Sequence, residues 1–456
     1  MQRESLGSRL GFILLSAGCA IGIGNVWKFP YLAGQNGGGA FVLVYLIFLL
    51  VLGVPVMTME FAMGRASQKS PVKMYQQLER PGQKWHIHGY VALSANFLLL
   101  MCYTTISGWM LKYFVDTAAG KFEGQTTAGL QALFGEMMND PLSMGIYAAI
   151  TLVLSGAVCA IGLKKGLERV TKVMMLALLA IMVVLAGNSL FLEGGAEGLK
   201  FYLIPDFGRM QKAGFGNVIV AAMNQSFFTL SLGIGSMAIF GSYIGKERAL
   251  MGESIRVAVL DTFVAISSGL IIFPACFAYG VEPDSGPDLL FITLPNIFNH
   301  LPWGRLWGSL FFVFMSFAAL STVLAVFENI VSCVMDLTTW SRRKTCLICA
   351  IALILLSMPC VLGLNVLSFI TPFGEGSSIM DLEDFIVNNL MLPLGSLLFL
   401  LFCVSRYGWG WNNFTNEANQ GKGMKVARWM RGYMTYVLPV IILVVFVVGL
   451  VQKFVI

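Results

Sequence analysis

Long apolar stretches dominate the chain, with short polar segments between them. A helix needs roughly 20 apolar residues to cross the hydrocarbon core of a bilayer. Stretches of about this length lie at 9–33, 39–62, 87–115, 143–162, 170–192, 217–243, 256–280, 306–337, 346–369, 385–405 and 434–453. This pattern predicts an all-α polytopic membrane protein with eleven spans. A further apolar segment at 285–300 is too short to span, and we expect it to form a re-entrant or capping hairpin.

Composition and charge agree with this fold class. Hydrophobic residues make up 57% of the 456 residues and charged residues only 12%, about half the charged share of soluble domains. The net charge of +6 does not indicate nucleic-acid binding, because most of the 30 Lys and Arg lie before span 1 or after spans 2, 4, 6, 8 and 10. The other gaps carry acidic residues instead. The positive-inside rule therefore places the N-terminus in the cytoplasm and the C-terminus outside.

Motifs for ATP use and hydrolysis are missing from the sequence. It contains no phosphate-binding loop of the G-x-x-x-x-G-K-[ST] type. It also lacks a G-x-S-x-G nucleophile elbow and an H-E-x-x-H metal pair. We therefore predict that the protein is not an enzyme and that an ion gradient drives any transport.

Two spans are interrupted by glycines next to a polar residue. Span 1 has glycines at 18, 22 and 24 followed by Asn25, and span 6 has glycines at 233 and 235 after Thr229. Small residues also allow tight helix packing, which would be the simpler explanation for a single glycine pair. Unwound backbone at this depth is tolerated where it lines a cavity, and paired broken helices are typical of inverted-repeat transporters with a site at the membrane midplane.

The two breaks occupy corresponding positions in the chain, which suggests an internal repeat. Each break lies in the first span of a five-span half. We expect a single transporter domain, 1–456, that consists of a first repeat at 9–192, a second and inverted repeat at 217–405, and an extra helix at 434–453.

Four ionisable residues lie inside apolar runs: Lys28, Glu60, Asp261 and Glu328. Each charge costs about 2.5–3.5 kcal/mol at the centre of a span, so we expect each of the four to have a role. We expect Glu60 and Glu328 to cap backbone groups that a broken helix leaves free. Asp261 is the best candidate for an ion ligand.

Several motifs resemble those of the neurotransmitter:sodium symporter family. The segment Gly22–Pro30, which reads GIGNVWKFP, closely resembles the first-helix signature, and Asn36–Phe41 follows at the family's spacing. The segments 165–169, 225–235 and 291–295 are similar to its fifth helix, sixth helix and outer capping loop. The resemblance covers nearly the whole chain, and the eleven predicted spans resemble the shorter bacterial members. It implies a 5+5 inverted-repeat fold with broken helices 1 and 6, in a bacterial inner membrane.

The resemblance also implies two sodium sites built only from oxygen atoms, as a hard cation prefers. The first would use the Ala20 carbonyl, Asn25, Thr229, Asp261 and the substrate carboxylate. The second would use the carbonyls of Gly18, Ile21 and Ala318 and the hydroxyls of Ser321 and Thr322. By the same resemblance, the substrate would bind to Ala20, Gly22, Gly24, Leu99, Tyr103, Ile106, Phe228, Thr229, Ser231, Ile234 and Val326.

Gate residues follow from the same motifs, and two of them fall where the chain departs from the family. Lys28 and Asp384 match the outer gate, and Arg3 and Asp336 match the inner gate, supported by Tyr243. Lys28 replaces the usual arginine, so bidentate geometry is lost and the outer latch is expected to be weaker. Leu176 replaces a proline of helix 5, which argues against an unwinding step during inner opening.

Other positions bear on the substrate. Members that transport monoamines carry aspartate where this chain has Gly22, so a substrate here must bring its own carboxylate. The apolar pocket then predicts hydrophobic amino acids, and Ile234 replaces a larger phenylalanine, which leaves room for aromatic ones. Animal members need chloride and have asparagine and serine where this chain has Asp261 and Ala265. Asp261 supplies that negative charge itself, so we expect transport that does not depend on chloride.

These observations predict a sodium-coupled symporter that imports hydrophobic L-amino acids by alternating access, with two sodium ions. The bilayer and the amino acid are the expected partners, and neither a nucleic acid nor an obligate protein partner is predicted. A sensor of the same fold, or a sodium-conducting channel, is the alternative.

Overall fold

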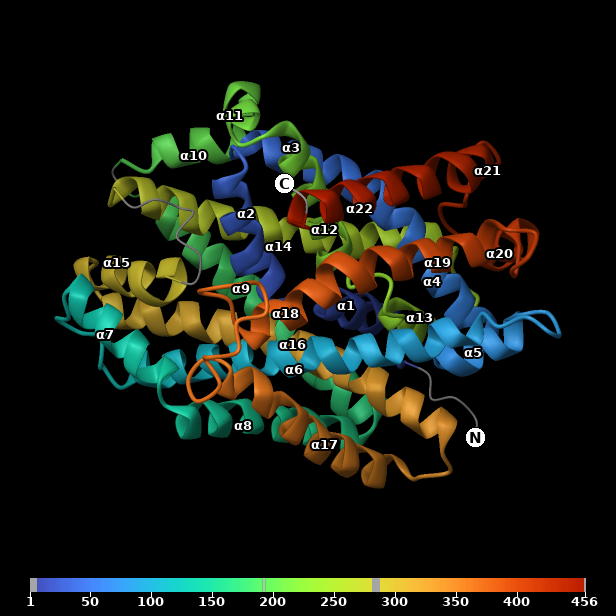
Figure 1. Ribbon diagram of the computed structural model, residues 1–456, viewed down its shortest axis with the longest axis horizontal. Coiled ribbons are helices and arrows are strands. Elements are labelled where there is room, and N and C mark those ends of the chain that lie inside the picture. Colours follow the sequence, from blue (N-terminus) through green and yellow to red (C-terminus); the bar gives the residue numbers. More distant parts are fainter. Residues whose placement is uncertain (1–5, 191, 193, 281–287, 455–456) are drawn as a thin grey trace.

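The computed structural model describes residues 6–190, 192, 194–280 and 288–454. Within these ranges the chain is almost entirely helical, and extended structure is limited to two isolated bridges, Gly38–Pro205 and Arg248–Lys422. The long helices run beside one another along the longest axis of the molecule (Figure 1). This arrangement is expected for a membrane protein, because a helix satisfies all of its backbone hydrogen bonds within one segment.

The helices of the first half supply five of the predicted spans. They are α1 (Arg9–Ala20), η1 (Gly24–Lys28) and α2 (Phe29–Gln35); α3 (Gly39–Phe48), η2 (Leu49–Gly53) and α4 (Val54–Ser67); α6 (His86–Ala118); α8 (Pro141–Ile161); and η3 (Leu163–Glu168) with α9 (Arg169–Leu190). Leu176 lies in α9, which is continuous around it.

The second half supplies the other six. They are α12 (Phe215–Thr229) and α13 (Ser236–Gly241); α14 (Leu250–Ala278); α16 (Gly304–Leu337); α17 (Arg342–Leu362); α18 (Ile379–Phe385), η5 (Ile386–Met391) and α19 (Leu392–Val404); and α21 (Met430–Gly432), η6 (Tyr433–Val437) and α22 (Leu438–Phe454).

Most of these segments meet the length and hydropathy of a membrane span. Among the described residues, nine continuous helices are long and apolar enough, and α1 with η1 and α2 forms a tenth span that is bent by 56°. The broken pair of α12 and α13 lies where the remaining span is predicted. The all-α polytopic fold class is therefore confirmed, and both helix breaks lie where the glycines predict them.

Four span boundaries differ from the prediction by six or more residues. Spans 5 and 7 were expected to begin at 170 and 256, but their helices begin at Leu163 and Leu250. Span 9 was expected to reach residue 369, but α17 ends at Leu362, three residues after Pro359. Span 10 was expected to begin at 385, but α18 begins at Ile379, where Ser378 and Asp381 form a capping box. Acidic residues in the first turns of α18 reduce its hydropathy, so the apolar pattern alone places this start too late.

Short helices cover the two ends of the bundle (Figure 1). They are α5 (Pro71–Leu78) and α20 (Trp411–Ala418) at one end, and α7 (Thr127–Met138), α10 (Ala196–Leu203), α11 (Phe207–Lys212) and η4 (Leu289–Thr293) with α15 (Leu294–His300) at the other. The described part of the expected capping hairpin is the helix η4–α15. Its Phe291 packs 4.8 Å from the ring of Tyr113 and 5.8 Å from that of Trp109. Residues 285–287 of the predicted hairpin lie outside the described residues.

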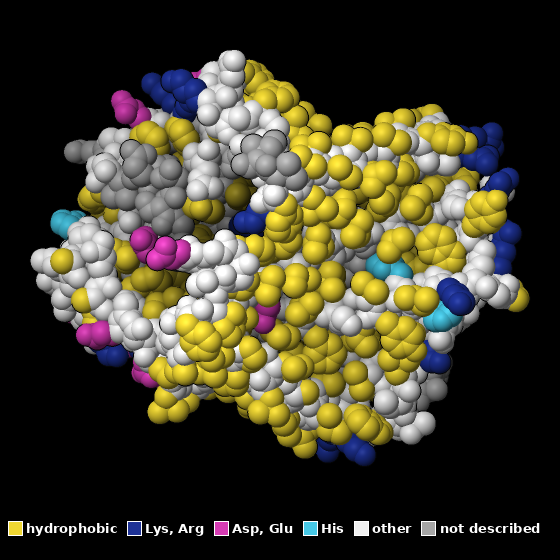
Figure 2. Space-filling view, in the orientation of Figure 1, with side chains coloured by type: hydrophobic (Ala, Val, Ile, Leu, Met, Phe, Trp, Pro, Cys, Tyr) yellow, Lys and Arg dark blue, Asp and Glu magenta, His cyan; other side chains and the backbone are white. Residues whose placement is uncertain are grey.

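The surface shows where the membrane would lie. Hydrophobic side chains cover the middle of the face shown in Figure 2, and charged side chains are concentrated towards its two ends. Apolar side chains of α22 such as Val440 and Val444 are more than half exposed to solvent in the isolated chain. Lipid tails cover such side chains in a membrane, so their exposure is consistent with the predicted apolar belt.

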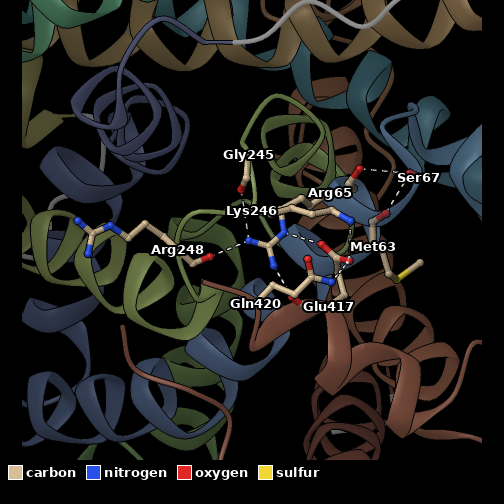
Figure 3. Close-up of polar contacts among 9 residues, drawn as sticks. Met63, Arg65, Ser67, Gly245, Lys246, Arg248, Glu417 and Gln420 are labelled. Atoms are coloured by element: carbon tan, nitrogen blue, oxygen red, sulfur yellow. Dashed lines mark hydrogen bonds and ion pairs between the residues drawn. The ribbon is translucent and has the colours of Figure 1, made fainter. Parts of the chain in front are cut away.

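A buried ion pair joins three segments at the end of the bundle that carries α5 and α20. The guanidinium of Arg65, in the last turn of α4, donates to Glu417 Oε1 of α20 over 2.6 Å and to the Glu417 carbonyl. It also donates to the carbonyl oxygen of Arg248 over 2.7 Å (Figure 3). The Arg65 side chain is completely buried. One arginine thus connects α4, the segment before α14 and α20.

Replacing Arg65 by alanine should strongly destabilise the protein. The change leaves the Glu417 carboxylate buried and without its principal cation, and breaking such a pair costs roughly 3–5 kcal/mol. Thermal unfolding of the purified protein in detergent measures the loss. Arg209→Ala removes a partly exposed ion pair with Asp206 and is the matched control, for which we expect little change. Equal transition temperatures in both variants would contradict the role of this ion pair.

Candidate functional site

The two helix breaks face each other in the middle of the bundle and leave backbone groups without helical partners. The break in span 1 covers residues 21–23, and the break in span 6 covers residues 230–235. Glu60 Oε1 accepts the N–H of Gly233 over 2.7 Å, and Asn96 Nδ2 donates to the carbonyl of Ile234 over 2.8 Å. Glu60 therefore caps a broken helix as predicted.

Glu328 does not follow this prediction. Its two carboxylate oxygens accept from the Arg342 guanidinium, each over 2.7 Å, and Oε1 also accepts from the Tyr243 hydroxyl over 2.8 Å. A carboxylate with a bidentate arginine partner is an ion-pair residue. The sequence missed this pair because Arg342 is the first residue of α17, 14 residues along the chain from Glu328, and looks like an ordinary charge at a helix start.

The residues predicted for the first sodium ion lie together. Asn25 Nδ2 is 2.7 Å from Asp261 Oδ1 and 3.0 Å from Thr229 Oγ1, and Thr229 Oγ1 is 3.0 Å from both carboxylate oxygens of Asp261. All three side chains are buried. Ala20, the last residue of α1, lies in the wall of the adjoining cavity. Breaks in spans 1 and 6 and the middle of α14 thus meet at one point.

The charge of this cluster fits a cation. Asp261 is fully buried, and its hydrogen-bond partners among the described residues, which include Tyr45 at 3.3 Å, are all neutral. A buried carboxylate without a positive partner is costly. A sodium ion at this position would supply the missing charge.

The second predicted set also converges. Ser321 Oγ lies 3.2 Å from the Ile21 carbonyl oxygen and 2.9 Å from that of Ala318. Thr322 Oγ1 lies 3.3 Å from the Ile21 oxygen and 3.5 Å from that of Gly18. Oxygen ligands at ~2.4 Å from a cation and at right angles to one another would be ~3.4 Å apart. These four distances are compatible with oxygen ligands around one cation.

A small cavity of about 10 Å³ lies beside the two oxygen clusters, room for roughly one water molecule. Small-molecule sites measure roughly 300–1,000 Å³, so an amino acid would require the side chains of this wall to move apart. The lining of the cavity consists of Cys19, Ala20, Gly22, Gly24, Leu99, Tyr103, Phe228, Ser231, Ile234, Thr322 and Leu392. Most of the predicted substrate residues are therefore in one cavity wall.

The lining differs from the prediction in a few places. Ile106, Thr229 and Val326 were predicted for the substrate but are not part of it. Thr229 points instead to Asp261, and Val326 is completely buried within α16. Cys19 and Leu392 line the cavity but were not predicted.

Two hydrogen bonds hold the unwound backbone against the cavity. The Tyr103 hydroxyl accepts the N–H of Ile23 over 2.7 Å, and Gln225 Nε2 donates to the Gly24 carbonyl over 3.1 Å. A side chain on Gly22 would overlap the Tyr103 hydroxyl and lie 2.5 Å from Thr322 Oγ1. Glycine is therefore required at this position for packing.

Gly22→Ala should weaken substrate binding. The added methyl group displaces the Tyr103 hydroxyl, and overpacking of this kind costs typically ~1–3 kcal/mol, or ~5- to 150-fold in affinity. Equilibrium binding of the labelled substrate at saturating sodium measures the effect. Gly187→Ala adds a methyl group to open space within α9 and serves as the control. A Gly22→Ala protein that binds substrate as tightly as this control would contradict the packing argument.

The two residues predicted for the outer gate form an ion pair. Lys28 Nζ lies 3.1 Å from Asp384 Oδ2 and 3.2 Å from Oδ1, and it also lies 4.7 Å from the centre of the Phe228 ring. Phe228 belongs to the cavity wall. The lysine therefore links the acidic start of span 10 to an aromatic wall of the cavity.

Polar contacts also join the N-terminal segment and Asp336 to neighbouring segments. Glu168 of the fifth-helix motif accepts the Gly7 N–H over 2.7 Å and the Ser8 hydroxyl over 3.0 Å. Asp336, predicted for the inner gate, accepts the backbone N–H of Ser70 over 2.7 Å. Its predicted partner Arg3 lies outside the described residues, so the inner pair stays a prediction.

Sequence reasoning missed several buried polar residues that support the site. Asn329 Nδ2 donates to Ser236 Oγ over 2.5 Å and to Asn96 Oδ1 over 3.2 Å, below the break of span 6. Tyr45 reaches Asp261. A buried asparagine in an apolar span is a detectable signal, whereas Tyr45 follows the ordinary pattern of an apolar helix.

Comparison with known proteins decides the family. The sequence matches the model of the sodium:neurotransmitter symporter family over residues 3–127 and 133–455. The chain belongs to the sodium:neurotransmitter symporter family. The predicted recognition is therefore correct, and the protein is a sodium-dependent membrane transporter of a family of transporters rather than enzymes.

Relatives of this family extend from bacteria to animals. The uncharacterized sodium-dependent transporter YhdH of Bacillus subtilis is 38% identical over 395 residues, which are 87% of this chain and 86% of that protein. An uncharacterized sodium-dependent transporter of Haemophilus influenzae is 30% identical over 462 residues, 98% of each chain. The sodium- and chloride-dependent GABA transporter 2 of Bos taurus is 27% identical over 465 residues, 90% of this chain and 74% of that protein.

A solved structure of the family has the same fold. The crystal structure of MhsT in complex with L-phenylalanine superposes with a TM-score of 0.89 at 36% identity, covering 98% of this chain and 100% of MhsT. This agreement confirms the predicted transporter fold with its broken helices.

Proposed function

We propose that this protein is a symporter that couples the import of hydrophobic L-amino acids to two sodium ions and does not require chloride. One observation carries the proposal. The fully buried Asp261, whose described partners are neutral, lies beside a small cavity whose wall also includes Thr322 of the second oxygen cluster. The expected location is a bacterial inner membrane, with the N-terminus in the cytoplasm and the C-terminus outside.

Cavity polarity supports an amino acid. The unwound backbone around Gly22, the end of α1 and the Tyr103 hydroxyl form the polar part of the wall. Tyr103 accepts the N–H of Ile23, so its own O–H can donate to a carboxylate. Without an acidic residue at position 22, the carboxylate that completes the first sodium site would come from the substrate. MhsT, which has the same fold, was crystallised with L-phenylalanine.

The rest of the wall supports a hydrophobic side chain. Leu99, Phe228, Ile234 and Leu392 offer apolar surface, and Lys28, the nearby cation, is engaged by Asp384. A charged side chain in this cavity would lose its hydration without finding a partner. Leucine and the aromatic amino acids are the expected substrates.

Alternating access would follow if the outer and inner contacts opened in turn. Opening of the Lys28–Asp384 pair would admit the substrate and sodium from outside. Release to the cytoplasm would require the contacts of Glu168 with the N-terminal segment to separate. Oxygen atoms from unwound backbone and from α14 and α16 would hold the ions between these steps.

Competition for uptake tests the substrate class. Purified protein in proteoliposomes takes up labelled leucine under an inward sodium gradient, and unlabelled compounds compete. Leucine, phenylalanine and tryptophan should compete strongly. Lysine, glutamate and phenethylamine, which lacks a carboxylate, should not. Competition by these three compounds at the same concentrations as phenylalanine would refute the assignment.

A further inference from the structure

We propose that Leu392 determines which sizes of side chain the cavity accepts, an inference that rests on the proposed function. Leu392 is the first residue of α19 and directly follows the π-helical turn η5. It lines the cavity together with Leu99, Phe228 and Ile234. Span 10 thereby contributes to the apolar wall.

Close packing between two glycines fixes the position of Leu392. A side chain on Gly395 would overlap the carbonyl oxygen of Gly233 in the break of span 6. A side chain on Gly233 would overlap the carbonyl oxygen of Leu392 and lie 2.8 Å from the backbone nitrogen of Ser396. The first turn of α19 is therefore in backbone contact with the break.

A hydrogen bond to Glu60 also holds the break of span 6 in place. Gly233 donates its N–H to the buried carboxylate of Glu60, 2.7 Å away, so it cannot move freely away from α19. Leu392 is only 1% exposed. A substrate side chain that is too large therefore meets a wall whose backbone cannot retreat, and one that is too small leaves empty space beside it.

The size of residue 392 should consequently alter selectivity. Removing or adding the equivalent of a methylene group in an apolar pocket changes discrimination by roughly 10- to 200-fold. Leu392→Ala should favour tryptophan over leucine by at least ~10-fold relative to the unmodified protein. Leu392→Phe should act in the opposite direction. The variant should lose affinity for tryptophan and keep its affinity for valine.

A matched control separates selectivity from stability. Leu400 lies on the same helix and is completely buried, but it is not part of the cavity wall. Leu400→Ala should lower thermal stability without changing the ratio of tryptophan to leucine affinity by more than about twofold. When each amino acid is saturating, the sodium concentration that gives half-maximal uptake should remain the same in all variants, because no predicted sodium ligand changes.

The experiment measures how valine, leucine, phenylalanine and tryptophan compete for uptake of labelled leucine in proteoliposomes. If Leu392→Ala does not fold, Leu392→Val tests the same direction with a smaller change. Unchanged ratios in both the enlarged and the reduced cavity, or an equal change in Leu400→Ala, would overturn the inference. An unmodified protein that accumulates none of these amino acids would instead overturn the proposed function, and the two failures are thus distinguishable.

Discussion

Asn25→Ala is expected to raise the sodium and the substrate concentrations needed for uptake together. Asn25 lies 2.7 Å from Asp261 and 3.0 Å from Thr229 in the cluster proposed for the first sodium ion. The substrate carboxylate is proposed to complete the same coordination shell, so loss of one ligand weakens both partners. Even residues that only orient a metal ligand are worth about 10- to 100-fold in affinity, and we expect at least the lower value here.

Thr322→Ala provides the comparison at the second cluster. This change removes a hydroxyl that lies 3.3 Å from the Ile21 carbonyl oxygen. It should raise the sodium requirement, with a smaller effect on the substrate affinity measured at saturating sodium. Sodium titrations of substrate binding measure both variants. If neither titration moved, the proposed ion sites would be wrong.

The double variant Asp261→Asn with Ala265→Ser should create a requirement for chloride. Asp261 is fully buried, and its carboxylate supplies the negative charge beside the proposed sodium ion. Asparagine keeps the shape but removes the charge, and a serine at the buried position 265 adds a hydroxyl that can donate to an anion. A buried cation without a compensating charge is costly. A chloride ion bound nearby would restore the balance.

Uptake by this variant should fall about 5- to 150-fold when gluconate replaces chloride, the usual range for coupled binding sites. Unmodified protein should transport equally well with either anion. Ala265→Ser alone keeps the carboxylate and is the matched control, for which we expect no chloride dependence. A large loss of uptake by the unmodified protein in gluconate would contradict the role assigned to Asp261.

The helix breaks could be predicted because glycine and polar side chains interrupt an apolar run at mid-depth. The same logic found Asp261 and the cap at Glu60, since a carboxylate in a membrane span needs a partner. The family motifs then assigned residues of four spans to one cavity. Which spans meet there depends on the topology of the chain, and no local sequence pattern specifies that topology.

Other features of the structure could not be predicted from the sequence pattern. Leu392 is an apolar residue in an apolar helix, so its place in the cavity wall depends on the approach of Gly395 to Gly233. Arg65 and Glu417 are 352 residues apart, and each resembles an ordinary loop charge in the sequence. The start of α18 was missed because Asp381 and Asp384 lower the hydropathy of its first turns. Asp381 caps the helix, and Asp384 pairs with Lys28. Tertiary contacts decide each of these cases.

Accumulation of labelled leucine or phenylalanine in proteoliposomes tests the central claim most directly. With sodium outside and potassium inside, the internal concentration should rise above the external one, and it should collapse when an ionophore dissipates the sodium gradient. Replacement of chloride by gluconate should leave this accumulation unchanged. Sodium-dependent binding without accumulation would indicate a sensor, and sodium flux that is independent of the amino acid would indicate a channel. Either result would contradict the account.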